Sequence, residues 1–117
     1  MTHKIPRDFS RYSVRELRAR RARLARQVPD LQAVIRGSLL IQRRRCGKPE
    51  CRCTRGELHG PYVYLAVRAG RRSRLLYIPA ELAQEVQRRV QMTERVEATL
   101  AELSAINLEL LSREELH

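Results

Sequence analysis

Three cysteines and one histidine lie close together in the middle of the chain. Cys46, Cys51 and Cys53 fall within eight positions, and His59 follows six residues after the last of them. Three thiolates and one imidazole are the ligand set of a Cys₃His structural zinc site. Lysine and arginine side chains adjoin the cysteines, and neighbouring cations favour the thiolate form that binds metal. The sequence therefore predicts zinc as a cofactor, held by these four residues.

The same cluster has other interpretations. Its spacing is not a standard Cys-x₂-Cys finger pattern, so three reduced cysteines in an irregular turn, or a redox-labile disulfide from Cys51 to a neighbour, stay open as alternatives. His59 is favoured as fourth ligand because His3 and His117 lie at the termini. A catalytic Cys–His pair is disfavoured, since no acid or asparagine in the cluster is placed to orient the imidazole, and four protein ligands leave the metal no open position. The protein is therefore expected not to be an enzyme.

Arginine dominates the charge of the chain. The 117 residues carry 24 Lys/Arg against 13 Asp/Glu, a formal net charge of +11. The charge is uneven, because Met1–Ile78 carries +15 and Pro79–His117 carries −4. A basic body of this kind attracts polyanions, and neutralising phosphates is the commonest use of such a field. Nucleic acid, either DNA or RNA, is therefore the expected partner, the alternative being that the two halves neutralise one another.

The predicted nucleic-acid surface surrounds the cysteine cluster and includes a hairpin that follows it. Phosphate contacts from arginine and lysine position a protein without reading sequence. Two tyrosines there are candidates for stacking on exposed bases, although ordinary sheet packing is the favoured explanation for them. The residues expected to contact nucleic acid are Arg43, Arg44, Arg45, Lys48, Arg52, Arg55, Arg68, Arg71, Arg72, Arg74, Tyr62 and Tyr64.

A small antiparallel sheet is expected to position the cluster. Residues 38–43, 61–68 and 73–78 are rich in aliphatic, β-branched and aromatic side chains, and Ala69-Gly70 supplies a hairpin turn. The predicted fold class is therefore α+β, with a zinc-stapled three-stranded antiparallel sheet, an N-terminal Arg-rich helix and a long C-terminal coiled-coil-like helix. The zinc-bound β head is expected over 37–79, after a flexible basic arm over 1–12.

The Arg-rich helix is expected over 13–28. Ser13 and Glu16 match a capping box, and Pro29 ends the pattern. One helix cannot bury all of its guanidinium groups, so they must face water, phosphate or acidic side chains. The helix is thus a second candidate surface for nucleic acid, while the alternative is that its arginines pair with glutamates of the long helix, namely Glu94, Glu97, Glu102 and Glu109.

The long helix is expected over 80–116. Pro79 suits its first turn, and no glycine or proline follows in the chain. Side chains at alternating steps of three and four residues predict a heptad seam for dimerisation or partner binding, in which Asn107 would set the register. The seam residues are Thr93, Val96, Leu100, Leu103, Asn107 and Leu110.

Several classes of protein are disfavoured by composition. No apolar stretch approaches the ~20 residues that span a bilayer, and the N-terminus lacks the apolar region of a signal peptide. No membrane partner is therefore expected. Three clustered cysteines do not resemble a secreted disulfide framework, which usually has an even count. The expected location is the cytoplasm, with association with the nucleoid as a further option.

Four short stretches resemble an uncharacterised bacterial family of small Cys-rich proteins. The resemblance covers residues 37–80, and the long helix more loosely. It implies a domain of unknown function that often accompanies transposases and other mobile-element genes, and it carries over only the Cys and His positions, as metal ligands. The stretches are Gly37-Ser38-Leu39, Arg44-Arg45-Cys46-Gly47-Lys48-Pro49, Cys51-Arg52-Cys53 and His59-Gly60-Pro61-Tyr62.

Two functions follow from these expectations. The first is a zinc-containing nucleic-acid-binding protein that serves a mobile element or recombination system and binds phosphate backbone through its arginines. The alternative is a protein-interaction adaptor, in which a zinc head on a coiled-coil stalk docks a transposase, a recombinase or another partner.

Overall fold

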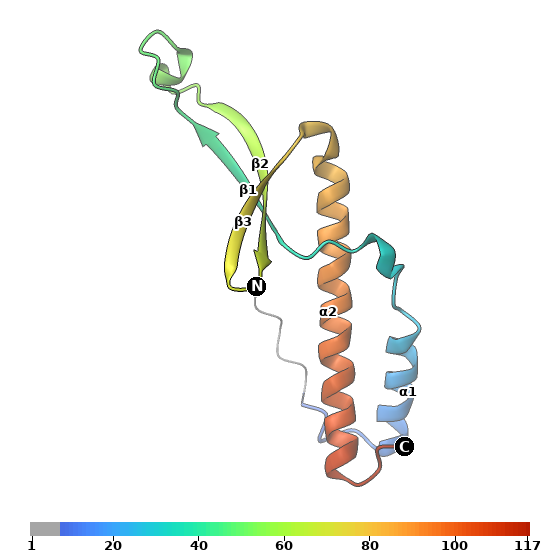
Figure 1. Cartoon of the computed structure of the whole chain (residues 1–117). Helices are drawn as coiled ribbons and strands as arrows, with labels where there is room; N and C mark the ends of the chain where they lie inside the picture. The colour runs from blue at the N-terminus through green and yellow to red at the C-terminus, as the bar shows by residue number, and fades with distance from the viewer. Residues whose placement is uncertain (1–7) are drawn as a thin grey trace. The chain divides into compact units, whose positions relative to one another are not determined.

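The computed structural model describes residues 8–117, which divide into two compact units. Ile35–Val90 form one unit, called the sheet unit here, and residues 8–34 and 91–117 form the other, called the helical unit. Helix α2 (Ala83–Ser112) contributes to both, because its residues up to Val90 belong to the sheet unit and the rest to the helical unit. The expected α+β fold, with a three-stranded sheet, an N-terminal helix and a long C-terminal helix, is confirmed (Figure 1).

The sheet consists of β1 (Ser38–Arg44), β2 (His59–Ala69) and β3 (Arg72–Ile78), paired antiparallel in that order. Valine, isoleucine, leucine and tyrosine predominate in these segments, which suits a pleated and half-buried surface. A two-residue turn joins β2 to β3. It begins with Gly70 at φ 67°, a left-handed conformation that favours glycine.

The strand register sorts the side chains of the sheet onto two faces. Tyr64 lies opposite both Leu40 of β1 and Tyr77 of β3, and residues opposite one another in antiparallel strands share a face. We call this the tyrosine face. The neighbouring residue Leu65 points to the other face and is buried. The alternation expected from the sequence is therefore observed, with an aliphatic side chain covered and aromatic side chains left accessible.

The helical unit is built on helix α1 (Val14–Ala25) and the C-terminal part of α2. Its core consists of Phe9, Leu17, Ile106 and Leu110, all buried. Burying each such side chain stabilises the fold by roughly 1.5–3 kcal/mol. At the start of α1 the Ser13 hydroxyl accepts the Glu16 N–H at 3.1 Å, as the capping box predicts, whereas the Glu16 carboxylate accepts from the same hydroxyl instead of from the Ser13 backbone.

Three boundaries in the helical unit differ from expectation. Helix α2 ends at Ser112 and not at residue 116, because Glu114 takes a positive φ of 56° and the Glu115 N–H turns back to the Leu110 carbonyl at 2.8 Å. Helix α1 ends at Ala25 and not at residue 28, because the N–H groups of Arg26 and Gln27 close a tighter turn onto residues 23 and 24. Residues 1–7 of the expected flexible arm lie outside the described part of the chain. Beyond them Phe9 is buried in the core, and the Arg113 guanidinium donates to the backbone carbonyls of residues 9, 10 and 12. Residues 8–12 therefore belong to the folded unit.

The seam expected on α2 is divided in the structure. Leu110 is buried in the core, and the side-chain Oδ1 of Asn107 accepts a hydrogen bond of 2.8 Å from the Arg21 guanidinium, so this part of the seam faces its own chain. Leu100, by contrast, is 58% exposed. Across residues 8–117, no helix combines the length and apolarity needed to cross a membrane.

Candidate metal centre

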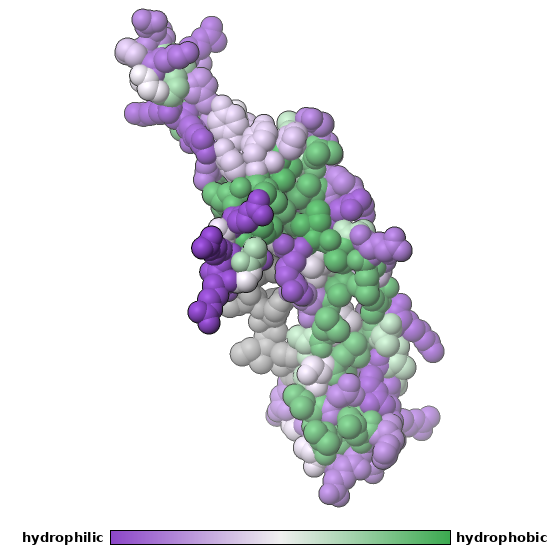
Figure 2. Space-filling model, viewed as in Figure 1, coloured by the Kyte–Doolittle hydropathy of each residue, from purple (hydrophilic) through white to green (hydrophobic). Residues whose placement is uncertain are grey.

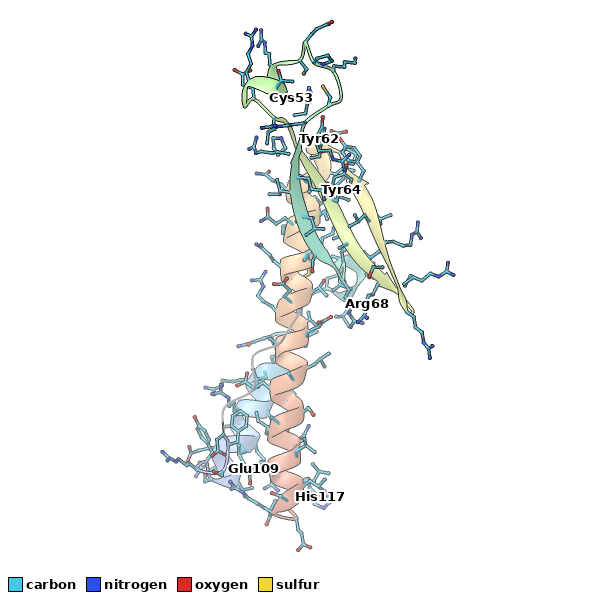
Figure 3. The ribbon with its side chains drawn as sticks, turned by 90° about the vertical axis from the view of Figure 1, so that its left-hand side faces the viewer. Cys53, Tyr62, Tyr64, Arg68, Glu109 and His117 are labelled. Atoms are coloured by element: carbon cyan, nitrogen blue, oxygen red, sulfur yellow. The ribbon has the colours of Figure 1, made fainter. Side chains whose placement is uncertain are left out.

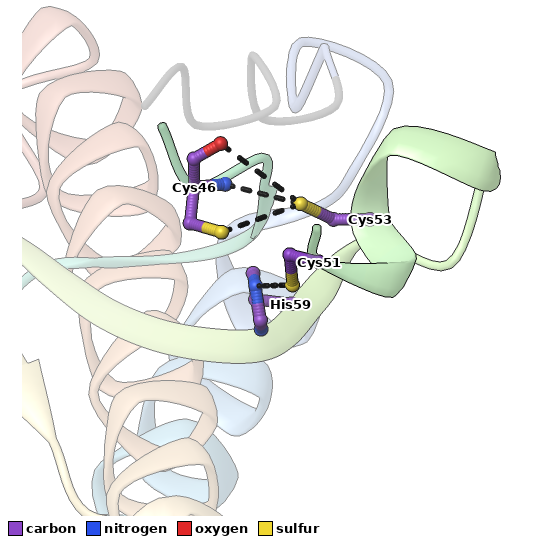
Figure 4. Close-up of side chains that lie close together, drawn as sticks. All are labelled: Cys46, Cys51, Cys53 and His59. Carbon is purple, nitrogen blue, oxygen red and sulfur yellow. Dashed lines mark hydrogen bonds between the residues drawn. The ribbon is translucent and has the colours of Figure 1, made fainter. Parts of the chain in front are cut away.

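The four predicted ligands converge at one end of the sheet (Figure 4). The ligand atoms of Cys46, Cys51, Cys53 and His59 all lie within 4.8 Å of one another. The sulfurs of Cys46 and Cys53 are 3.5 Å apart, and the Cys51 sulfur is 3.0 Å from His59 Nε2. Sulfurs bound to one tetrahedral zinc ion are about 3.8 Å apart, since each Zn–S bond is about 2.3 Å. These four side chains therefore lie close enough to hold a metal ion.

The sheet and one short helical turn position these ligands. Cys46 lies two residues beyond the end of β1, and His59 is the first residue of β2, paired with Arg44. The other two cysteines are brought in by a 3₁₀ turn, η2 (Arg52–Arg55), for which Cys51 is the N-cap residue. The Thr54 hydroxyl donates to the Cys51 carbonyl at 2.7 Å and tightens this turn.

Two glycines allow the backbone to close around the site. Gly56 ends η2 in the left-handed region at φ 102°. Gly60 follows the histidine ligand at φ 114°, where a Cβ atom would lie 2.8 Å from the Gln42 carbonyl oxygen. Any larger residue at position 60 would be strained and would collide with β1, at the bulge where the strand register shifts.

The two cysteines of the 3₁₀ turn differ in their electrostatics. The backbone N–H of Cys53 and the Cys46 side chain hold the pKa of Cys51 at about 7, below its ordinary value. Burial raises the pKa of Cys53, which is 0% exposed, although its sulfur accepts the Cys46 N–H at 3.3 Å. A metal ion bound at Cys53 would have to displace the thiol proton, and its positive charge would then compensate the cost of burying the thiolate.

The structure bears on the choice of the fourth ligand. His59 joins the three cysteines, whereas His117 belongs to the helical unit and His3 lies outside the described residues. Three sulfurs and one imidazole nitrogen form a closed, four-coordinate set of the kind found in structural zinc sites.

The predicted nucleic-acid residues fall into separate groups on the sheet unit. The first group, the loop basic group, adjoins the metal ligands, and the second, the hairpin basic group, lies at the β2–β3 turn (Figure 3). Arg68 lies nine positions after His59 on β2, which corresponds to ~30 Å along the strand. All members are exposed: Arg43, Arg45, Lys48, Arg52 and Arg55 in the loop basic group, and Arg68, Arg71, Arg72 and Arg74 in the hairpin basic group.

Arg44 differs from these arginines because it lies over the tyrosine face. Its guanidinium carbon is 5.8 Å from the centre of the Tyr62 ring and 5.2 Å from that of Tyr64. It also donates to the Tyr64 hydroxyl at 2.7 Å and to the Gln42 side chain at 3.0 Å. The structure therefore brings together three of the predicted residues, Arg44, Tyr62 and Tyr64, as one cluster.

Sequence reasoning missed Tyr77 as a member of this cluster. Its ring lies 5.8 Å from that of Tyr64 in an edge-on arrangement, and it lines the same groove of about 450 Å³. The alternation of residues 73–78 assigns it to the face of Leu75, but only the register with β2 brings it beside Tyr64. The groove is lined by Arg44, Arg45, Cys46, His59, Tyr62, Tyr64 and Tyr77.

Several arginines of α1 face acceptors within the helical unit. Arg20 forms an ion pair with Glu102, which was one of the expected glutamates. Arg18 pairs with Glu115 at 3.1 Å. Glu109 instead pairs with Arg113 of its own helix region at 2.9 Å. The alternative of pairing between the Arg-rich helix and acidic residues at the end of the chain is therefore observed for part of α1.

The fold and the site together define a small α+β protein with a candidate Cys₃His metal centre. The family described as Domain of unknown function (DUF6788) matches residues 14–88. This segment makes up more than half of the chain and contains all four candidate ligands, so the protein belongs to that family. No curated protein and no solved structure matches the chain.

Proposed function

We propose that this protein is a zinc-containing nucleic-acid-binding protein that contacts phosphates through the arginines of its sheet unit. The proposal rests on one observation, which is that the five side chains of the loop basic group are exposed and not neutralised by ion pairs with carboxylates of residues 8–117. The sheet unit holds thirteen Lys/Arg and four Asp/Glu, a net charge of +9. Such a surface attracts a polyanion and releases its counterions.

In this proposal zinc would be structural and would stabilise the loop that carries the basic side chains. Cys46, Cys51, Cys53 and His59 would hold the ion, and a closed ligand set of sulfur and nitrogen is the one that zinc favours. The ion would fix the loop that bears Lys48, Arg52 and Arg55, so that their charges are presented together and little ordering entropy is lost on binding.

Matched charge removal tests the proposal. One variant carries Arg43→Gln, Arg45→Gln and Arg52→Gln, and its control carries the same exchange at three exposed arginines of the helical unit, Arg15, Arg23 and Arg26. The measurement is the affinity for an oligonucleotide of about 12 nucleotides across a salt series, with nuclease-treated protein. We expect the first variant to lose about tenfold or more and to flatten the salt dependence by about 0.7–0.9 for each phosphate contact removed. Equal losses in both variants would contradict the proposal.

We infer no catalytic role for the cysteines. Cys53 is buried, and the four ligands leave a bound zinc ion without an open position for water. The protein with zinc bound should therefore show no cysteine-dependent hydrolysis or transfer, and its thiols should resist alkylation. A thiol that stays reactive at full zinc occupancy would favour the enzymatic alternative.

A protein-interaction adaptor is the second candidate, and one observation favours it. Leu100, Leu108 and Leu111 of α2 are 58%, 62% and 55% exposed and fall within about 80° of arc on an ideal helix. A transposase, a recombinase or a second copy of the chain could cover them. Leu108→Glu should abolish binding of such a partner and leave oligonucleotide affinity unchanged, whereas the triple arginine variant should do the reverse.

We propose an accessory role in a bacterial mobile-element or recombination system, exercised in the cytoplasm or at the nucleoid. This part of the proposal is supported by the resemblance carried by the cysteine motif and by clustered cysteines suited to metal rather than to disulfides. Sequencing of nucleic acid cross-linked to the protein in cells tests it, because reads enriched at mobile-element ends are expected. Reads spread evenly over the genome would contradict it.

A further inference from the structure

The tyrosine groove beside the metal ligands suggests a more specific ligand than phosphate alone. We propose that this groove binds an unpaired base of single-stranded nucleic acid, an inference that rests on the proposed function. The ligand chemistry is a flat, exposed base with a phosphate beside it, which single-stranded DNA and RNA share. Four observations support this assignment: the aromatic cluster, the orientation of Arg44, the position of the groove, and the apolar surface that adjoins it.

The aromatic cluster has an accessible ring. Tyr77 is 58% exposed, although it lies against Tyr64, and nothing in the described chain covers its outer side. Tyrosine combines an apolar ring with a polar hydroxyl and is enriched at interfaces, where the ring makes contact while the hydroxyl stays hydrated. An exposed ring beside two others offers a stacking surface for a base. Every base has a flat face that can stack, so binding of this kind does not depend on which base is present.

Arg44 adds a cation that is held in place before any ligand arrives. Its guanidinium lies over Tyr62 and Tyr64 and donates to the Tyr64 hydroxyl, so little side-chain entropy remains to be lost on binding. Arg45 lines the same groove and is exposed, with no carboxylate partner in residues 8–117. Bases stack on guanidinium planes as well as on aromatic rings, and an adjacent arginine neutralises the phosphate.

The groove also has suitable size and neighbours. Its volume of about 450 Å³ falls in the range of small-ligand sites, and the metal ligands Cys46 and His59 form part of its wall. A bound ion would therefore hold one side of the groove in place. Figure 3 shows Cys53, Tyr62, Tyr64 and Arg68 in this order from the metal ligands toward the β2–β3 turn. The groove therefore adjoins the loop basic group, whose Arg45 lines it, and the hairpin basic group lies beyond it along β2.

The tyrosine face continues past the groove as an apolar surface. Leu40 is 40% exposed and Leu75 is 56% exposed on this face, and Figure 2 shows a hydrophobic patch next to a weakly hydrophilic one over the sheet. Arg68 shares the face by strand alternation. A single strand laid along β2 would thus meet arginine at both ends and stacking or apolar surface between them. A duplex would not fit this pattern, because its bases are already paired and stacked.

An abasic oligonucleotide separates base binding from phosphate binding. The probes are a single-stranded thymidine oligomer of about 12 nucleotides, its uridine RNA counterpart, an abasic oligomer with the same number of phosphates, and the corresponding duplex. We expect the single strands to bind about tenfold or more tightly than the abasic oligomer at equal salt. The stronger of the two single-stranded probes then identifies the sugar that the site prefers.

Variants of Tyr77 test whether the difference arises in the groove. Tyr77→Ala should remove most of the preference for bases and leave abasic affinity unchanged, while Tyr77→Phe keeps the ring and should stay within about twofold of the parent. Metal content and circular dichroism of each variant check its folding. The chain has no tryptophan and four tyrosines, three of which line the groove, so stacking should also quench the intrinsic fluorescence.

The outcomes distinguish this inference from the proposed function. Equal affinity for the thymidine and abasic oligomers, or a preference for duplex, would overturn base binding and leave phosphate binding standing. Failure of every oligomer to bind at low salt would overturn both. A loss of base preference in Tyr77→Phe as large as in Tyr77→Ala would show that the ring is not the stacking surface.

Discussion

The helical unit and the sheet unit are both rich in arginine but use it differently. Residues 8–34 and 91–117 hold nine Lys/Arg and nine Asp/Glu, whereas the sheet unit has a net charge of +9. In the helical unit Arg18, Arg20 and Arg21 donate to Glu115, Glu102 and Asn107. In the sheet unit the loop basic group has no carboxylate partner among residues 8–117. An arginine count alone therefore says little about ligand binding, because the supply of nearby acceptors decides which guanidinium groups stay available.

The two units also differ in what holds them together. The helical unit has a core of four buried apolar side chains. Between Arg45 and Leu58 of the sheet unit, Cys53 is the only buried residue. A loop with so little apolar burial cannot offset the entropy of its ordering through the hydrophobic effect. Hydrogen bonds within the Cys₃His cluster supply part of the missing stability in the metal-free loop, and metal binding can supply most of the rest.

Removal of one buried metal ligand should have the largest effect. It should release the metal and destabilise the sheet unit, while the helical unit stays folded. Cys53→Ser should lower metal content from about one ion per chain to near zero, since structural zinc contributes on the order of 10 kcal/mol in small zinc domains. The signal of α1 and α2 in circular dichroism should largely persist. Elemental analysis measures the loss of metal. A second variant, His59→Gln, should also lower the metal content, and His117→Gln is its matched control because His117 is not among the four candidate ligands. Full metal content in Cys53→Ser would contradict the assignment of Cys53 as a metal ligand.

Loss of a paired arginine should cost more stability than loss of an unpaired one. Arg20 and Glu102 are each 24% exposed, and Arg20 also lies over the Phe9 ring at 5.7 Å. Arg20→Met should therefore destabilise the helical unit by about 1–2 kcal/mol. Arg45→Met, at an exposed and unpaired position, should change stability by less than about 0.5 kcal/mol. Urea unfolding measures the free energy of unfolding of both variants. Equal losses of stability would mean that the arginines of the helical unit do not contribute more to stability than those of the sheet unit.

Asn107 provides a smaller test of the helical unit. Asn107→Leu removes the acceptor of the Arg21 hydrogen bond, so stability should fall by about 1 kcal/mol. Arg21 keeps the carbonyls of residues 116 and 117 as further acceptors, which limits the loss. If the intrachain contact is the role of this asparagine, sedimentation should show the same oligomeric state in both proteins. A changed oligomeric state would instead support the register-setting role that the sequence predicts.

The smallest effect concerns pH and is confined to the sheet unit. The pKa of Cys51 is lowered from 9.0 to about 7, so ionisation of this thiol stabilises the metal-free fold fully above pH 9 and no longer does so once pH falls through about 7. In metal-free protein, alkylation of Cys51 should therefore rise with a midpoint near pH 7, and this midpoint should move toward 9 in urea. Cys53 should react more slowly, because burial raises its pKa. Mass spectrometry after timed alkylation measures both, and a Cys51 midpoint that urea leaves unchanged would contradict the prediction.

Much of the fold was accessible from local sequence patterns. The strands were predicted at 38–43, 61–68 and 73–78 and begin and end within two residues of those limits. The four candidate ligands were predicted correctly as neighbours, because a short loop with glycine and proline can bring them together whatever the rest of the chain does. The burial of Phe9 was missed, since a single aromatic residue in a polar segment carries no periodic signal.

The sequence by itself determined the ligand types, the strands, the start of α1 and the excess of positive charge, because these depend on residues near one another in the chain. Only the tertiary structure decided that Tyr77 lies beside Tyr64, that Arg20 meets Glu102 across 82 positions, and that the two basic groups lie at opposite ends of β2. Strand register and helix packing set these contacts. Both depend on burial summed over whole elements, which no short stretch of sequence encodes.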